Sequence, residues 1–299
     1  MNGTPAVCLI GFGEVGQVLA ADLAARGVST LSAWDRQFAD AASAPRRAAA
    51  RSGVRVGSDA ADALSGAVVA ISAVTASECV SAARQCAPSL APGTYYLDLN
   101  SVAPATKLEA AALIEAAGGR YVEAAVMSPI SPKRIAAPIL LGGPRARGFQ
   151  PLAAGLGFSG AEVFADETGR ASAAKMCRSV MIKGIEALLT ESLLSARHYG
   201  VERTVLESLE GMLPVGDWQA LSRYMISRSL QHGTRRAEEM REVARTVEAA
   251  GITPWMSLAC AARQDWAADS GRTASVEPLE ALLDAVLKAR VNAPGAPRC

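Results

Sequence analysis

A glycine-rich loop near the start of the chain constrains the fold more than any other feature. The apolar run at residues 6–10 leads directly into Gly11-Phe12-Gly13-Glu14-Val15-Gly16, and a helical stretch follows. In a strand–loop–helix unit the first glycine makes a tight turn, the second lets a pyrophosphate approach the backbone, and the third lets the helix pack on the strand. The free N–H groups at the helix start then face the phosphates. The loop therefore predicts a dinucleotide site.

An acidic residue follows where such a site needs one. Asp35 ends a second apolar run and lies about 20 residues after Gly16, the spacing typical of the acid that holds the adenosine ribose. Its carboxylate can accept hydrogen bonds from the ribose 2′-OH and would repel a 2′-phosphate. This favours NAD. NADP stays open as the alternative, because Arg36 could partner a phosphate if Asp35 turned away.

The composition argues against several classes of function. A formal net charge of +1 provides no basic surface for nucleic acid or an anionic membrane. The longest apolar stretch, residues 67–74, is too short to span a bilayer, and residues 1–5 do not resemble an export signal. We therefore expect a cytoplasmic protein with no nucleic-acid or membrane partner. The cysteines lack C-x-x-C pairing, which predicts reduced thiols and no metal site; they are Cys8, Cys79, Cys86, Cys177, Cys260 and Cys299.

The first half of the chain alternates between short strands and helices. After the first strand–helix unit, strands are predicted at residues 30–34, 54–56, 67–72, 95–98, 121–125, 137–142 and 161–164. Helices are predicted at 14–26, from 58, at 77–86 and at 104–117. This alternation predicts an α/β Rossmann domain with a doubly wound parallel sheet over residues 1–167. Right-handed crossovers would place the strand-to-helix loops on one edge of the sheet.

From residue 168 onward only helical periodicity remains. Helices are predicted at 171–199, 202–212, 217–230, 234–250, 254–268 and 277–290, with glycines such as Gly233 as stops between them, and the tail 292–299 is predicted to be disordered. We therefore expect an all-helical domain over residues 168–299. Its apolar surface, which includes Trp218, Trp255 and Trp266, predicts a homodimer built mainly by this domain.

Candidate site residues fall after three predicted strands and on the long helix. Lys175, Ser179 and Lys183 are spaced i, i+4 and i+8, so they share one helix face. A solvated basic stripe is the common explanation of such a pattern. The small residues before Lys175 favour close approach to a backbone or ligand instead; they are Gly169, Ala171, Ser172 and Ala173. For Ser101, simple helix capping is the alternative. The loop candidates are Ser72, Ala73 and Val74, then Asn100 and Ser101, then Met127 and Ser128.

Taken together, these segments resemble the β-hydroxyacid dehydrogenase superfamily, which includes 3-hydroxyisobutyrate and 6-phosphogluconate dehydrogenases. The glycine loop matches the cofactor loop of that family, and Asp98-Leu99-Asn100-Ser101-Val102-Ala103-Pro104 matches its D-x-S-T-x-S-P segment. Gly169-Arg170-Ala171-Ser172-Ala173-Ala174-Lys175 matches its G-x-G-x-x-x-K, with alanine in place of the second glycine. The segments Lys175-Met176-Cys177-Arg178-Ser179 and His232-Gly233-Thr234-Arg235-Arg236 resemble a branch with a C-terminal helical domain called DUF1932.

The resemblance implies hydride transfer between NAD, or NADP, and a secondary alcohol or hydroxyacid-like small molecule, a reaction of the EC 1.1.1 type. Lys175 would be the general acid/base, and it must then be partly neutral, a form that burial and a nearby cation favour. Ser179 would bond the reacting hydroxyl, and Lys183 or Arg178 would supply the cation or bind an anionic substrate group. Asn100 and Ser101 would meet the nicotinamide ribose or carboxamide. Met127, Ser128, Arg178 and His232 would line the substrate.

Two departures from the family pattern argue against a short 3-hydroxyacid as the substrate. Met127 replaces the serine that helps to hold the substrate carboxylate, and Ser179 replaces an asparagine. Two other functions also remain open. An imine reductase-like enzyme generally carries Asp or Tyr where Lys175 stands. A non-catalytic NAD(P)-binding sensor would keep the glycine loop and Asp35 but would not need the lysine.

Overall fold

The computed structural model describes residues 4–212, 216–269 and 273–291. The chain divides into two compact units, Met1–Met176 and Cys177–Cys299, and the boundary lies inside α7 (Arg170–His198). We had expected the boundary between residues 167 and 168, before this helix. It lies later because the first turns of α7 are hydrogen-bonded to the sheet of the first unit. The tail 292–299, which the sequence predicts to be disordered, lies outside the described residues.

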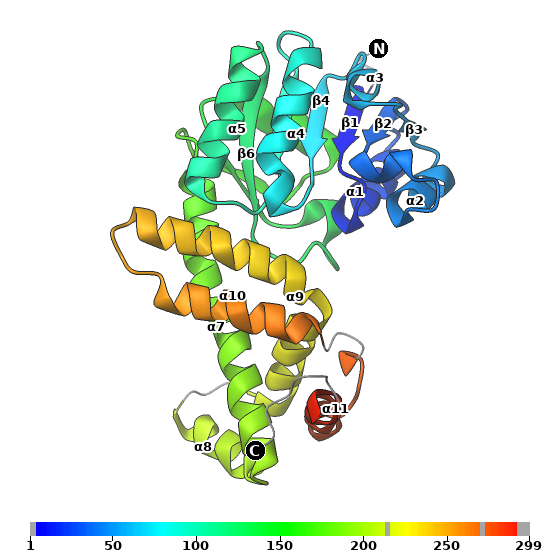
Figure 1. Ribbon diagram of the computed structural model, residues 1–299. Coiled ribbons are helices and arrows are strands. Elements are labelled where there is room, and N and C mark those ends of the chain that lie inside the picture. Colours follow the sequence, from blue (N-terminus) through cyan, green and yellow to red (C-terminus); the bar gives the residue numbers. More distant parts are fainter. Residues whose placement is uncertain (1–3, 213–215, 270–272, 292–299) are drawn as a thin grey trace. The chain divides into compact units, whose positions relative to one another are not determined.

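The first unit is built on an eight-stranded sheet with the order β3-β2-β1-β4-β5-β6-β7-β8 (Figure 1). The strands are β1 (Val7–Ile10), β2 (Leu31–Trp34), β3 (Arg55–Val56), β4 (Val69–Ser72), β5 (Tyr95–Asp98), β6 (Arg120–Val126), β7 (Ile139–Gly142) and β8 (Ala161–Ala165). Neighbouring strands are parallel except β6 and β7, which are antiparallel. The predicted doubly wound parallel sheet is therefore confirmed, with one antiparallel pair that the sequence did not predict. The segment between them holds only the 3-10 turn η4 (Arg134–Ala136), whereas a parallel connection usually needs a crossover helix.

Helices cover both faces of this sheet. They are α1 (Glu14–Ala25), α2 (Ala44–Ser52), α3 (Ala60–Leu64), α4 (Cys79–Cys86), α5 (Pro104–Ala116) and α6 (Ala146–Leu156). The sequence did not predict α2 or α6. The first is rich in arginine and alanine without an apolar stripe, and the second carries Pro151 in its interior. Both form because each helix buries an apolar residue in the core of the sheet, Ala49 in α2 and Phe149 in α6.

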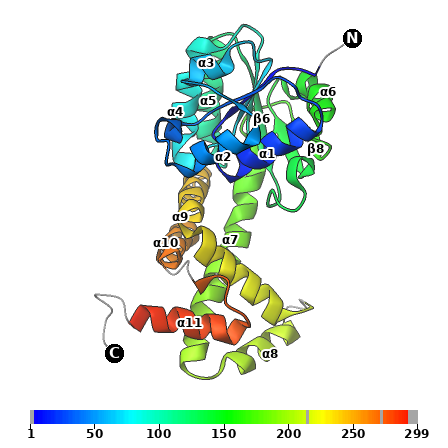
Figure 2. The same ribbon diagram turned by 90° about the vertical axis from the view of Figure 1, so that its right-hand side faces the viewer.

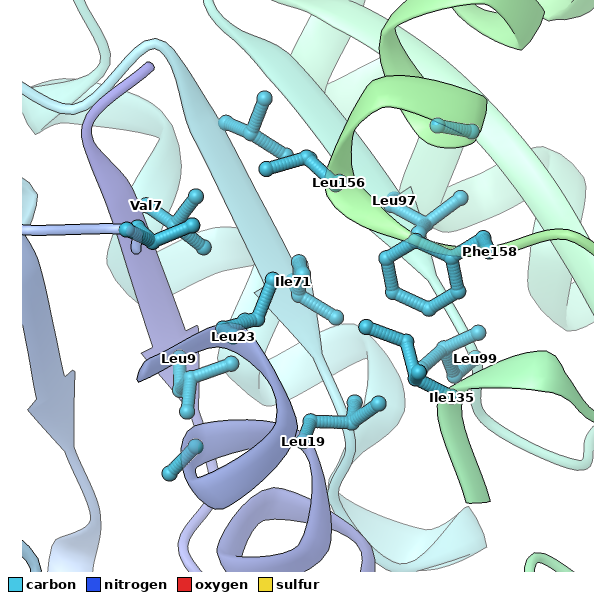
Figure 3. Packing of buried hydrophobic residues seen from close by; sticks show 14 of the residues in the cluster. Val7, Leu9, Leu19, Leu23, Ile71, Leu97, Leu99, Ile135, Leu156 and Phe158 are labelled. Atoms are coloured by element: carbon cyan, nitrogen blue, oxygen red, sulfur yellow. The ribbon is translucent and has the colours of Figure 1, made fainter. Parts of the chain in front are cut away.

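Alternate residues of the central strands enter two separate cores, as the pleat of a strand requires. Val7 and Leu9 of β1 face Leu19 and Leu23 of α1 in one core (Figure 3). Cys8 and Ile10, between and after them, face the residues of α3, α4 and α5 in the other core. A sheet buried on both faces leaves its edges and the loops at its strand ends as the places where a ligand can bind.

The second unit contains the remainder of α7 with α8 (Glu202–Met212), α9 (Trp218–Ala249), α10 (Trp255–Ala268) and α11 (Leu279–Val291). Helices α9 and α10 lie side by side (Figures 1 and 2). The sequence predicted two helices separated near Gly233, and α9 does break there, because His232 has non-helical backbone angles (φ −124°, ψ 19°) between two helical segments. Gly233 also allows close packing, because a Cβ there would lie 2.7 Å from the Ala268 backbone nitrogen of α10.

None of the described helices combines the length and the apolar character that a membrane span requires. Within the same residues, no cluster of histidine, cysteine and carboxylate side chains could hold a metal ion. Cys8, Cys79, Cys86, Cys177 and Cys260 are free thiols, while Cys299 lies outside the described part of the chain.

Candidate active site

The glycine loop connects β1 to α1 and has the shape of a phosphate cradle. Gly11 has a φ of +92°, and a Cβ there would lie 2.5 Å from the Ala73 carbonyl oxygen. A Cβ on Gly13 would meet no atom within 4 Å, so the space in front of this residue is open. Gly13 is also the N-cap of α1, and no side chain caps the helix. The loop therefore has both the room and the N–H donors that a pyrophosphate needs.

Asp35 is held beside this loop. Its Oδ2 accepts the Phe12 N–H at 2.8 Å, and its Oδ1 accepts the Gln37 N–H at 2.8 Å. Each carboxylate oxygen keeps a second lone pair with which it can accept a ribose hydroxyl. Arg36, the residue next to Asp35, is exposed and pairs with Glu78 at 2.6 Å. In this arrangement the carboxylate is fixed at the loop and Glu78 engages the guanidinium.

The side chain of Asn100 has a structural task. It is buried, its Oδ1 accepts the Val74 N–H at 2.7 Å, and its Nδ2 donates to Ser72 Oγ at 3.0 Å. These bonds fasten the loop after β4 to the loop after β5. The cofactor contacts that the sequence predicted for Asn100 and Ser72 stay predictions. Ala73 and Val74, which are half-buried, remain candidates at the cofactor edge.

Lys175 and Ser101 are joined directly. Lys175 Nζ donates to Ser101 Oγ at 2.5 Å, although 74 positions separate the two residues. Ser101 follows β5, and the glycine loop follows β1, so both lie at the carboxyl edge of parallel strands. Helix α5 has Ala103 as its N-cap, so the alternative reading of Ser101 as the capping residue is wrong.

A buried carboxylate fixes the start of the helix that carries Lys175. Glu123 of β6 is fully buried; its Oε2 accepts the Gly169 N–H at 2.7 Å and its Oε1 accepts the Ser172 N–H at 2.6 Å. The carboxylate satisfies two backbone donors at the start of α7, and its charge complements the helix dipole. Glu123 pairs in register with Gly142 of β7, where a Cβ would lie 2.5 Å from Oε2. The sequence did not predict that Glu123 would bind the start of α7. The only sign of such a role was an acidic residue inside an otherwise apolar strand.

Met127 and Ser128 lie half-buried in the segment between β6 and β7. The Met127 N–H donates to the Pro138 carbonyl at 2.8 Å. The same segment is tied to α1, because the Asp22 carboxylate accepts Arg134 Nε at 2.8 Å and the Ile135 N–H at 3.0 Å. Arg134 has a φ of +54°, a left-handed conformation rare for a non-glycine residue, which these bonds stabilise. The predicted substrate segment is therefore anchored at its far end.

The other predicted residues belong to the second unit. Ser179 and Lys183 are buried, which excludes a solvated stripe for these two positions. Lys183 pairs with Glu239, so its charge is compensated, and this weakens the roles predicted for it as a tuning cation or an anion ligand. Arg178 is exposed. His232 lies at the kink of α9 and is hydrogen-bonded to Arg228 at 2.7 Å.

Comparison with known proteins establishes the family. Residues 6–164 match the model of the NAD binding domain of 6-phosphogluconate dehydrogenase, and residues 196–267 match the domain of unknown function DUF1932. The chain belongs to the β-hydroxyacid dehydrogenase superfamily. The resemblance inferred from the sequence is thereby confirmed, as are the Rossmann fold and the NAD-binding domain. A comparison of this chain with curated proteins found no match.

Several solved structures share the whole fold. A conserved hypothetical protein from Sinorhizobium meliloti 1021 is 35% identical, with 96% of this chain and 97% of that one covered at a TM-score of 0.71. The conserved protein MTH1747, described as structurally similar to 3-hydroxyacid dehydrogenases, is 33% identical, with 95% and 99% covered at a TM-score of 0.67. The 3-hydroxyisobutyrate dehydrogenase of Mycobacterium tuberculosis, solved with L-serine, is 19% identical over 95% and 99% at a TM-score of 0.70, which shows the shared fold.

Proposed function

We propose that this superfamily member is an NAD(P)-dependent oxidoreductase that acts on a secondary alcohol or hydroxyacid-like substrate, with Lys175 as the general acid/base. The hydrogen bond between Lys175 and Ser101 is the observation that supports this most strongly. It holds an amine at the sheet edge where the glycine loop offers room for a dinucleotide. When bound, the nicotinamide supplies the hydride acceptor or donor.

Each residue of the first unit has a defined task in this proposal. Oxidation of an alcohol removes a hydride from carbon and a proton from the hydroxyl, and Lys175 Nζ takes that proton. In the reverse direction Lys175 returns it. Ser101 orients the amine through its hydroxyl, and Glu123 fixes the helix from which the lysine projects. Gly13 admits the pyrophosphate, and Asp35 accepts the adenosine ribose hydroxyl.

We also propose that the active form is a homodimer in which α7 of one copy meets the second unit of another. From residue 177 onward, one face of α7 carries Met181 and Leu188, which are 64% and 58% exposed. They are seven residues apart with Gly184 between them, so they form one apolar stripe. Large apolar side chains that stay exposed along a helix are typical of an interface.

Cofactor binding and turnover together test the enzyme proposal. Full-length protein is titrated with NADH while the nicotinamide fluorescence is followed, and is then assayed with NAD or NADP against a panel of secondary alcohols and hydroxyacids. NADH binding with turnover of an alcohol is the expected result. Turnover of imines alone would favour the imine reductase-like alternative, and NADH binding without turnover of any substrate would favour the sensor. Absence of NADH binding would overturn all three.

A further inference from the structure

The second unit contains a group of charged side chains on α7 and α9 that the proposed reaction does not use. Lys183 and Arg235 both pair with Glu239, and Arg236 pairs with Glu186. Apart from Arg235, these residues are buried. Each carboxylate is therefore already committed to at least one cation, and Glu239 is shared between two.

Arg228 adds a further positive charge to this group without a carboxylate of its own. Within the described ranges, no Asp or Glu lies at salt-bridge distance from its guanidinium. Its hydrogen bond goes to His232 Nε2 at 2.7 Å. Because arginine is always protonated, it must donate this bond, which leaves His232 neutral with its proton on Nδ1. Burial, followed by the nearby Arg236 and Arg235, lowers the pKa of Arg228, while Tyr224 and the Glu186 carboxylate act in the opposite direction. The net effect is downward, so the guanidinium lies where a positive charge is disfavoured.

Two donors of the group are also unsatisfied. Arg228 Nε and Arg236 Nε are buried and have no hydrogen-bond partner among the described residues. A buried donor without a partner is destabilising. Water could satisfy a donor but would not balance the charge. An anion would do both.

We propose that Arg228, with His232 and Arg236 beside it, binds the oxyanion group of a small ligand, either a carboxylate or a phosphate. A guanidinium suits both, since its N–H groups can donate in parallel to two oxygens. Arg228 and His232 are only half-buried, so solvent reaches the group from their side. The Nδ1–H of the neutral His232 supplies a further donor. This site goes beyond the proposed function because it uses no residue of the cofactor loop or of the Lys175–Ser101 pair. It gives His232 a role other than the substrate lining that the sequence predicted.

The two histidines of the chain make the site observable. Full-length protein carrying isotope-labelled histidine is titrated near neutral pH with inorganic phosphate, and separately with acetate, against sodium chloride at matched ionic strength. We expect the ring signals of His232 to shift saturably with at least one of the two anions, while those of His198 stay in place. The anion that acts identifies the ligand chemistry. If neither anion moves the His232 signals beyond the chloride control, the proposal is overturned.

Substitutions on α9 then assign the response to Arg228. Arg228→Gln should abolish the anion-dependent shift, and Arg228→Lys, which keeps the charge, should retain part of it. Arg241→Gln is the matched control, since Arg241 lies on the same helix in an exposed pair with Asp265. An undiminished response in Arg228→Gln would overturn the assignment. NADH binding is measured on the same samples, so failure of the anion site and failure of the proposed oxidoreductase function give different results.

Discussion

The Glu123 carboxylate of β6 accepts the backbone N–H of Ser172 at 2.6 Å, one turn before Lys175 on α7. A charged group inside the sheet therefore sets where this helix begins. Because the helix is continuous from Arg170, the position of the lysine follows from the position of that first turn. Glu123 therefore helps to place Lys175, the proposed proton carrier, through the backbone of α7.

Replacing this carboxylate tests the link. Glu123→Gln leaves one carbonyl oxygen where two oxygens accepted N–H groups, so one backbone donor at the start of α7 loses its partner. We expect the free energy of unfolding in urea to fall by about 1–3 kcal/mol, the usual cost of an unsatisfied buried donor. Glu162→Gln, on the exposed side of β8, is the matched control. Equal stability of the two variants would contradict the assigned role.

Lys175→Met tests the proposed chemistry. Methionine keeps most of the volume of the side chain but cannot carry a proton, so packing should change little. We expect turnover to fall by about 10²–10⁴-fold, the usual contribution of a positioned acid–base group, with NADH affinity nearly unchanged. Lys288→Met on α11 is the control, as that lysine is exposed. Full activity of Lys175→Met would remove the lysine from the mechanism, and loss of turnover in Lys183→Met instead would move the role to Lys183.

Much of the first unit could be predicted because its signals are local. An apolar run that ends at Gly11 marks β1, and one that begins after Gly66 marks β4. The glycine loop marks the start of α1. The antiparallel direction of β7 could not be predicted, because contacts distant in sequence decide it. The break in α9 was marked by Gly233, next to the non-helical His232, but the close approach of α10 to that glycine could not be foreseen.

In the candidate site, too, local sequence signals could be recognised and contacts between distant residues could not. The types and spacing of Gly11, Asp35 and Lys175 could be recognised in the sequence. The partners of Glu123 could not, since they lie 46 and 49 positions away. For Asn100 the family resemblance implied a contact with the nicotinamide ribose or carboxamide. Its amide also binds the loop after β4, a contact that only the packed structure reveals.

Cofactor preference depends on Asp35 and its neighbour. With Asp35 fixed to the loop and Arg36 engaged by Glu78, we expect a higher kcat/KM with NAD than with NADP. The double variant Asp35→Ser, Glu78→Gln removes the repelling charge and releases the guanidinium, which should shift the ratio toward NADP. Glu78→Gln alone should shift it less. A wild-type enzyme that already favours NADP would refute the reading of Asp35.

The exposed stripe on α7 predicts the oligomeric state. Light scattering should give about twice the chain mass of 30.9 kDa at micromolar concentration. Leu188→Glu places a charge in the stripe and should shift the protein toward the monomer. Leu108→Glu changes an equally exposed leucine on α5 and should not. A monomeric wild type would rule out the proposed dimer.

The pH dependence of stability should reveal His232. Burial, followed by Arg228, Arg235 and Arg236, lowers its pKa from 6.5 to about 4 in the folded protein. Between these values the unfolded chain binds a proton that the native protein does not, so this residue makes the free energy of unfolding fall as the pH is lowered from about 6.5 to about 4. Above that window it contributes no slope.

Comparison with His232→Asn isolates this term, because asparagine does not titrate. Burial raises the pKa of the Glu186 carboxyl, which gives a slope of the opposite sign, but that slope is present in both proteins. We therefore expect the wild type to lose more stability than His232→Asn when urea unfolding is followed from neutral to acidic pH. His198→Asn, at the end of α7, is the matched control for replacing a histidine by asparagine. Parallel curves for the wild type and His232→Asn would show that burial and the α9 arginines do not hold His232 neutral.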